Sequence, residues 1–176
     1  MKRIGILSDT HGFIDPAIYT FFAECDEIWH VGDFGNLETL NTLAKFKPLR
    51  GVYGNIDGQE IRVIFKKHLK FRCEEVKVWM THIGGYPGHY DQSVKPGIVT
   101  DPPDLFISGH SHILKVMYDK KLKFLHINPG AAGNTGFHQV KTLLRFVIDG
   151  KNIRDLEVME IKRNKDRVAT PNNAPE

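Results

Sequence analysis

The apolar positions in the first third of the chain form short continuous runs that alternate with segments of helical periodicity. Residues 2–8 (KRIGILS), 27–31 (EIWHV) and 49–53 (LRGVY) are each rich in apolar and β-branched side chains. Uninterrupted runs of this kind are typical of strands that are buried on both faces. We therefore predict three strands here, the third of which is closed by Gly54.

Two helices are predicted between these strands. Asp15 and Pro16 form a typical helix start, with Asp as N-cap and Pro at the first helical position, and this helix should run to about Glu24. Asn36 is the expected N-cap of a second helix. Its apolar positions fall on one face and are Leu37, Leu40, Leu43 and Ala44. The resulting β-α-β-α-β order implies parallel pairing with right-handed crossovers.

From about residue 68 onward, the pattern predicts strand after strand. The expected strands are 70–75, 76–82, 105–109, 115–119, 123–128, 142–149 and 153–161. Hairpin turns are predicted at 119–121 and at Asp149-Gly150, which is a strong turn signal. A parallel half followed by an antiparallel half predicts an α/β domain in which two packed sheets have helices outside.

Two segments have a different character. Residues 84–104 are rich in Gly and Pro, and a loop of this length in a compact domain is often functional. Residues 164–176 have no periodicity and are expected to be a disordered tail. One domain is therefore predicted over residues 1–163.

Composition adds constraints on class and location. A chain of 176 residues with 41% hydrophobic and 26% charged residues is typical of one soluble domain. No apolar run approaches membrane-spanning length and the N-terminus lacks the pattern of a signal peptide, so we expect a cytoplasmic protein without membrane association. Cys25 and Cys73 lack zinc-site and redox-motif spacing and are expected to be buried free thiols.

The net charge of +3 is modest, and Lys and Arg concentrate in residues 66–72 and 161–167. Basic runs of this size are usually solvated faces or chain ends. Contact with the phosphate backbone of a nucleic acid is the alternative, which predicts an affinity that falls steeply with salt.

The candidate chemistry lies in five short fragments, each directly after an apolar run: SDTHG, HVGD, YGNID, MTH and SGHSH. Ligands at strand ends indicate one crevice, and two metal ions in a crevice are typical of phosphoryl transfer. The fragments supply seven candidate ligands of two metal ions, which are Asp9, His11, Asp33, Asn55, His82, His110 and His112.

The spacing of these residues favours a shared site. One residue separates Asp9 from His11, and the same spacing recurs at His110 and His112, so in extended backbone both members of each pair point to one side. The carboxylate of Asp33 can place one oxygen on each of two metals. Two divalent cations, two aspartates and a hydroxide leave a charge of about +1, which suits an anionic phosphate ester. Imidazole and carboxylate ligands without thiolates favour Mn, Fe, Co, Ni or Zn, with manganese as the leading candidate.

The fragments DTH, GD, GNID, TH and GHSH, in this order, resemble the signature of the calcineurin-like metallophosphoesterases. The resemblance runs from about Lys2 to Ile161, and the segment INPGAAG is similar to the small bacterial and archaeal phosphodiesterase branch. It implies a four-layer α/β sandwich of two mixed β-sheets flanked by helices. It also implies in-line attack on the phosphate ester by a hydroxide that bridges two metal ions.

The same resemblance divides the ligands between the two metals. It implies that Asp33 bridges both ions and that Asp9, His11 and His112 complete the first site. It implies further that Asn55, His82 and His110 complete the second, and that the catalytic residues are Asp33, Asn55 and His110.

Two positions depart from the family pattern. Many protein phosphatases of the family carry a histidine where this chain has Ile56, and that histidine can protonate the leaving group. Close relatives often have His-Gly-His at the fifth ligand, where this chain has His82-Ile83-Gly84. His89 in the following loop is a candidate replacement for the missing histidine. These departures favour a phosphodiester with a good leaving group over a phosphoprotein.

Further residues are candidates for support of the site. His30 is expected to pack beside the ligands or support them, and Asp57 to accept a hydrogen bond from a ligating histidine or to cap a turn. Asn128 could face the site or close a turn. No function is assigned from the sequence to the remaining histidines of the domain, which are His68, His126 and His138.

The sequence therefore predicts a metal-dependent phosphodiesterase that acts on a small phosphate ester. One alternative is a phosphomonoesterase of small metabolites. Another is a catalytically silent scaffold, because a eukaryotic trafficking-complex subunit resembles this fold. Self-association to a homo-oligomer through free sheet edges is an open expectation.

Overall fold

The first of two five-stranded sheets has the strand order β12-β11-β1-β2-β3 in the computed structural model, which describes residues 1–163. The predicted parallel pairing of the three N-terminal strands is confirmed, while β11 and β12 extend the sheet antiparallel on the other side of β1. The strands are β1 (Lys2–Leu7), β2 (Glu27–His30), β3 (Leu49–Gly51), β11 (Val140–Asp149) and β12 (Asn152–Lys162).

The second sheet has the order β4-β5-β8-β10-β9 and is also mixed. The predicted antiparallel pairing in the second half of the chain is confirmed for β4–β5, β9–β10 and β11–β12, but it was wrong for the three central strands of this sheet, which are parallel. The long connection after β5 carries the chain back to start β8 in the same direction, and β9 reverses the chain between β8 and β10. The strands are β4 (His68–Cys73), β5 (Val76–Thr81), β8 (Leu105–Ile107), β9 (Leu114–Asp119) and β10 (Phe124–Pro129).

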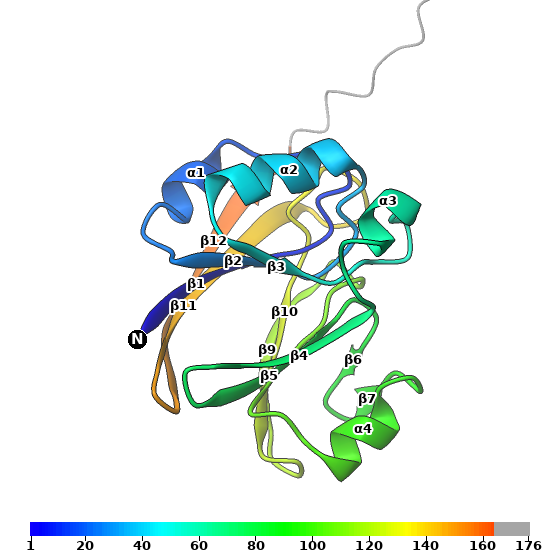
Figure 1. Cartoon of the computed structure of the whole chain (residues 1–176), viewed down its shortest axis with the longest axis vertical. Coiled ribbons are helices and arrows are strands. Elements are labelled where there is room, and N and C mark those ends of the chain that lie inside the picture. Colours follow the sequence, from blue (N-terminus) through cyan, green and yellow to red (C-terminus); the bar gives the residue numbers. More distant parts are fainter. Residues whose placement is uncertain (164–176) are drawn as a thin grey trace, which may run out of the picture.

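Helices α1 (Ala17–Phe21) and α2 (Leu37–Phe46) cover the outer face of the first sheet (Figure 1). The predicted cap of α2 is confirmed, because the Asn36 side chain accepts a hydrogen bond from the Thr39 N–H at 2.8 Å. Helix α1 ends earlier than the expected Glu24. Its C-terminal carbonyl at Phe21 accepts a hydrogen bond from the Arg145 guanidinium on β11, so this end is satisfied from another strand.

Several short elements were not predicted. Helix α3 (Gln59–Arg62) follows β3, and the expected loop at 84–104 contains the hairpin β6 (Gly85–Tyr86) and β7 (His89–Tyr90) and helix α4 (Lys95–Thr100). Elements of two to six residues are too short to show a hydrophobic period. Helix α4 and the hairpin cover the outer face of the second sheet, opposite the side occupied by α1 and α2 (Figure 1).

Both predicted hairpin turns are present. The turn between β9 and β10 begins at Asp119, whose carbonyl accepts the N–H of Lys123 at 2.7 Å. The turn between β11 and β12 places Gly150 in the left-handed region, with φ +58°. Cys25 and Cys73 are buried free thiols, as predicted. The expected tail at 164–176 lies outside the described residues.

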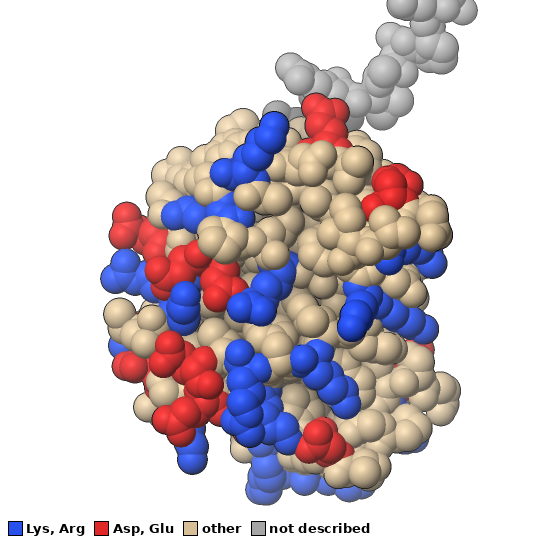
Figure 2. Space-filling model, in the orientation of Figure 1, with Lys and Arg blue, Asp and Glu red and all other residues tan. Residues whose placement is uncertain are grey.

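The surface of the second sheet is basic along one edge. Figure 2 shows Lys and Arg side chains gathered over β4 and β5. This region includes the predicted basic segment 66–72. Among residues 1–163, no helix has the length and apolar character needed to cross a membrane.

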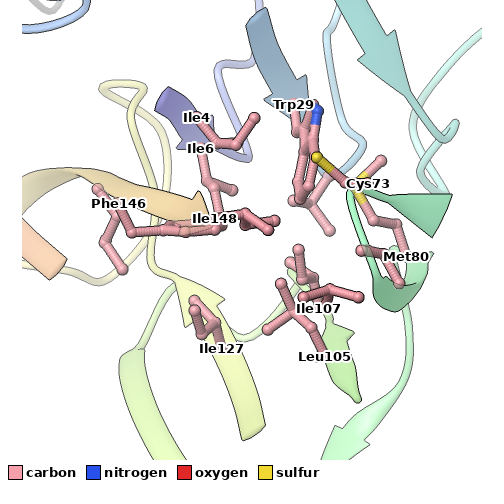
Figure 3. Close-up of a cluster of buried hydrophobic side chains, with 14 of the residues drawn as sticks. Ile4, Ile6, Trp29, Cys73, Met80, Leu105, Ile107, Ile127, Phe146 and Ile148 are labelled. Carbon is pink, nitrogen blue, oxygen red and sulfur yellow. The ribbon is translucent and has the colours of Figure 1, made fainter. Parts of the chain in front are cut away.

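The main core lies between the two sheets. Trp29 of β2 packs edge-on against Phe71 of β4 and Phe146 of β11, with ring centroids 5.0 and 6.0 Å apart. A second cluster packs α1 and α2 against the first sheet. The expected α/β architecture with two packed mixed sheets is therefore confirmed. The inter-sheet residues labelled in Figure 3 are Ile4, Ile6, Trp29, Cys73, Met80, Leu105, Ile107, Ile127, Phe146 and Ile148.

Truncation of the inter-sheet core should destabilise the protein strongly. Ile107 is fully buried on the central strand of the second sheet. We expect Ile107→Ala to lower the free energy of unfolding by about 2–5 kcal/mol, because it removes packed methyl groups and leaves a cavity. Val99→Ala on the exposed face of α4 is the control and should change it by about 0.5 kcal/mol or less. Urea denaturation measures both, and equal effects would contradict this description of the core.

Candidate metal centre

The ends of five strands converge at one edge of the two sheets, and the loops that follow them carry the candidate ligands. Asp9 and His11 follow β1, Asp33 follows β2 and Asn55 follows β3 in the first sheet. The second sheet contributes His82 after β5 and two histidines after β8, which are His110 and His112.

Six of the seven candidates form two groups. Asp9, His11 and His112 each offer a ligand atom, and these atoms lie within 4.8 Å of one another. The same holds for Asp33, His82 and His110. Each group combines residues from both sheets, and the four histidines divide between the groups in the way that the family resemblance implies.

Two carboxylates connect the groups. Asp33 Oδ2 lies 3.2 Å from His82 Nε2 in its own group and 3.8 Å from His11 Nε2 in the other. Asp9 Oδ1 lies 3.1 Å from His112 Nε2 and 3.8 Å from His82 Nε2. By these distances, Asp33 and Asp9 lie equally close to both groups.

Asn55 occupies the rim rather than the interior of this arrangement. It is exposed, and it lines a hollow of about 240 Å³ together with His82, Arg62 and Lys67. The seventh candidate is therefore beside the second group, at the point where solvent or a ligand can reach it.

The donor atoms at the centre fit a cation. His82 Nδ1 lies 2.7 Å from the carbonyl oxygen of Val31, so this nitrogen carries a proton and, in the neutral imidazole, Nε2 presents a lone pair toward the carboxylates. Among the described residues, neither His82 Nε2 nor Asp9 Oδ1 has a hydrogen-bond partner, although both atoms are buried. Buried polar atoms are rarely left unpaired. Two unpaired acceptors that face each other are the arrangement that a metal ion would satisfy.

Asp33 and His82 stabilise each other's charged forms. Burial works against the charged form of both Asp33 and His82. Their mutual contact outweighs burial, so the pKa of Asp33 is held below its usual value and the pKa of His82 is raised above its usual value. Asp33 is therefore ionised and available to a cation.

The backbone at the site is left-handed, which the sequence interpretation did not foresee. Non-glycine residues rarely adopt positive φ, and each such residue costs about 1–3 kcal/mol. The expectation of extended backbone at the two paired spacings was wrong, because the chain turns sharply as it leaves each strand. The φ values lie between 47° and 68° at five ligands, which are Asp9, His11, Asp33, His110 and His112.

Hydrogen bonds between loops hold this backbone in place. The N–H groups of Asp9 and His11 donate to the carbonyls of Gly32 and Asp33, at 3.0 and 3.1 Å. Gly109 N–H donates to the His82 carbonyl at 2.9 Å. The loops of neighbouring strands thus support one another.

Close approach requires glycine at two positions. A Cβ at Gly54 would lie 2.0 Å from Asp33 Oδ1, and a Cβ at Gly109 would lie 2.3 Å from Ser8 Oγ. Neither contact leaves room for a side chain, so these glycines allow the ligand loops to pack together.

Asp57 anchors the loop of Asp33. It is buried, and its Oδ2 accepts the N–H groups of Asp33 and Gly54 at 3.0 and 2.7 Å. Its Oδ1 accepts the N–H of Gly35 at 3.0 Å. These bonds favour the capped-turn interpretation of Asp57 over the interpretation as an acceptor for a histidine.

His30 supports the loops that carry the candidate ligands by packing and by hydrogen bonds. Its ring is fully buried and stacks on Phe34 with 3.6 Å between centroids. Its Nδ1 accepts the Gly32 N–H at 3.2 Å, so Nε2 carries the proton and lies 2.9 Å from Thr10 Oγ1. Burial lowers the pKa of His30 to about 3, which keeps the ring neutral.

The side chain of Asn128 holds a loop of the site and also closes a turn. Its Nδ2 donates to the carbonyl of Gly109 at 2.8 Å and to Ser111 Oγ at 3.1 Å, so it holds the loop that carries His110. Its Oδ1 accepts the Gly130 N–H at 3.0 Å and closes its own turn.

Two residues at the site were missed in the sequence. The Arg62 guanidinium donates to the carbonyls of Asp57 and Asn55 at 2.6 and 3.2 Å, which fixes the loop of Asn55. The ring of His138 lies 5.2 Å from that of His112. Neither residue belongs to a fragment with recognisable spacing, so only the folded chain reveals its position.

Ile56 and His89 mark the two departures from the family pattern. The Ile56 N–H donates to Asp33 Oδ1 at 3.1 Å, while its side chain is 46% exposed. His89 is exposed on β7 and lines a hollow that also contains His110. The structure thus places His89 and the candidate ligand His110 in the lining of the same hollow.

Comparisons with known proteins agree with this geometry. Residues 1–151 match the family model of the calcineurin-like phosphoesterase superfamily domain. A probable metallophosphoesterase of Methanothermobacter thermautotrophicus is 28% identical over 135 residues, which are 73% of this chain and 76% of that protein.

Two solved structures show the same fold. One is an archaeal phosphodiesterase with 24% identity and a TM-score of 0.65, matched over 89% of this chain and 99% of that chain. The other is wild-type Vps29 from Entamoeba histolytica in complex with Zn²⁺, with 15% identity and a TM-score of 0.66, matched over 92% of this chain and 99% of that chain.

Removal of the Asp57 carboxylate should destabilise the ligand loops. Asp57→Ala leaves three N–H groups without their acceptor, and we expect it to lower the free energy of unfolding by about 3 kcal/mol. Asp57→Asn keeps one acceptor oxygen and should cost about half as much. Denaturation of both variants in metal-free buffer measures the difference. An alanine variant as stable as the wild type would refute the anchoring role.

Proposed function

The chain belongs to the calcineurin-like phosphoesterase superfamily, and on this premise we propose that it is a phosphodiesterase that uses two divalent transition-metal ions. The observation that carries the proposal is the pair of ligand groups connected through Asp33. At their centre lie Asp9 Oδ1 and His82 Nε2, two buried atoms without a hydrogen-bond partner in the described part of the chain. We propose manganese as the physiological metal, in line with the imidazole and carboxylate donors.

The residues of the site have separate tasks in this proposal. Asp9, His11 and His112 would hold one ion, Asn55, His82 and His110 the other, and Asp33 would contact both. When bound, two divalent ions activate water and neutralise charge on the phosphoryl oxygens. The Val31 carbonyl orients His82, and the Ile56 N–H orients Asp33, so the ligands are positioned before any ion arrives.

Positive charge beside the centre supports an anionic substrate. Arg62 and Lys67 line the hollow that contains Asn55 and His82. Lys67 directly precedes β4 in the chain. A phosphate group that approaches this side meets two cationic side chains before it reaches the ligands. We propose a small phosphate ester as substrate, and a nucleic acid remains an alternative that predicts strong salt dependence.

Ile56 favours a diester over a phosphoprotein. Its side chain carries no proton to donate, and it occupies the position at which a proton donor would stand in many protein phosphatases of the family. A substrate whose leaving group departs without protonation by the protein suits this site. We therefore favour diesters with good leaving groups, with phosphomonoesters of small metabolites as the second candidate.

Substitution of Asp33 should abolish hydrolysis while the fold persists. We expect Asp33→Asn to lower kcat for bis-p-nitrophenyl phosphate with Mn²⁺ by at least about a hundredfold. In metalloenzymes, substitution of a residue that only hydrogen-bonds to a metal ligand already lowers activity by up to about this factor. Glu38→Gln on the exposed face of α2 is the control and should keep full activity. Circular dichroism checks the fold of both variants.

The activity of the wild type also distinguishes an enzyme from a catalytically silent scaffold. If the wild type hydrolyses no mono- or diester with Mn²⁺, Fe²⁺, Co²⁺, Ni²⁺ or Zn²⁺, the enzymatic proposal fails. Retention of wild-type turnover by Asp33→Asn would equally contradict the role given to Asp33.

The two ligand groups should be separable by mutation. We expect the wild type to bind two Mn²⁺ ions and His112→Ala to bind one, because His112 belongs to the first group alone. Calorimetric titration of the metal-free protein, with elemental analysis of the loaded protein, gives the count. His89→Ala should keep both ions. A single ion in the wild type would refute the two-metal proposal, and a lost ion in His89→Ala would add His89 to the ligands.

A further inference from the structure

A second hollow adjoins the metal centre on the outer face of the second sheet. Its volume is about 250 Å³, and its lining includes His110, so it opens directly onto one ligand group. The hairpin β6–β7 forms one wall, and strands β9 and β10 form the other. The lining residues used below are Ile83, Tyr86, Ile113, Lys115 and His126.

His126 is the unusual residue of this hollow. Its side chain is fully buried, and among residues 1–163 neither ring nitrogen has a hydrogen-bond partner. Burial, and secondarily the charge of Lys115, lower the pKa of His126 to about 4, so the imidazole is neutral. A neutral imidazole offers one donor and one acceptor. A buried group of this kind that lines a hollow indicates a polar ligand inside it.

The other walls are mainly apolar and aromatic. Tyr86 is 38% exposed on β6, and the Lys115 ammonium lies 3.5 Å from the centroid of its ring. This contact holds the Lys115 ammonium, which is a hydrogen-bond donor, at the wall of the hollow. Ile83 and Ile113 add apolar surface. Apolar walls with a few placed polar groups are typical of sites for small organic ligands.

We propose that this hollow takes the nucleobase of a nucleotide ester whose phosphate reaches the metal centre, a proposal that rests on the phosphoesterase function above. A planar heterocycle can contact the apolar walls with its faces and pair with His126 and Lys115 along its edge. A hydrocarbon ring would leave His126 unpaired. An anionic group would meet the carboxylate of Asp91 as well as the Lys115 ammonium, and otherwise mainly apolar side chains.

The size of the hollow agrees with one base. Drug-sized ligands occupy about 300–1,000 Å³, so a hollow of about 250 Å³ accommodates one ring system. The sugar and phosphate would then extend past His110 toward the ligands. The substrate class is thus a mononucleotide ester or a dinucleotide, with one base in the hollow.

Binding to the metal-free protein tests the base site independently of catalysis. The probes are adenosine 5′-monophosphate and ribose 5-phosphate, which differ only by the base. We expect calorimetry to show the nucleotide binding at least about tenfold more tightly, as for one base on an aromatic platform. Tyr86→Ala and His126→Leu should remove this preference. Tyr118→Ala, an exposed tyrosine on β9 outside the lining, is the matched control and should keep it.

The outcomes separate this proposal from the function on which it rests. Equal affinity of the wild type for both probes would overturn the base site, whether or not esters are hydrolysed. A preference that survives in Tyr86→Ala would also overturn it, and this variant changes an exposed hairpin residue, so the test does not depend on the folding of His126→Leu. A base preference without hydrolysis of any ester would support the site and overturn only the phosphodiesterase proposal.

Discussion

The left-handed backbone of five ligand residues is the constraint on which the rest of the site depends. Each of these residues leaves a strand by a turn that is unfavourable for a side-chain-bearing residue, and the turn directs its side chain toward the centre. The surrounding structure compensates for this cost. Asp57 and the hydrogen bonds between loops hold the turns, and Gly54 and Gly109 allow the loops to approach. The convergence of ligands is thus a property of all the loops together.

Much of this arrangement could be predicted from local sequence. The strands of the first sheet and the Asn36 cap follow from apolar runs and capping preferences, which act within a few residues. The candidate ligands were identified because each follows directly on such a run. The structure then brings a carboxylate oxygen of Asp9 and one of Asp33 each within 4 Å of His82 Nε2.

The rest depends on contacts between distant segments. The parallel pairing of β5, β8 and β10 is determined by how the chain crosses between them, which periodicity does not encode. Arg62 and His126 lie in segments without a recognisable motif, and they acquire their positions only when β3 and β10 join their sheets. Extended backbone was the natural assumption for Asp9 and His11, and it failed because the neighbouring loops impose another conformation.

Each ligand group takes residues from both sheets, and this has a thermodynamic consequence. His112 must come from the second sheet to join Asp9, and Asp33 must come from the first to join His82. An ion bound by such a group would therefore act as a crosslink across the sandwich. The core around Trp29 and Ile107 sets the spacing that the crosslink spans. Metal affinity and sheet packing would then be one linked equilibrium, so small core substitutions far from the candidate ligands would change the affinity for the metal.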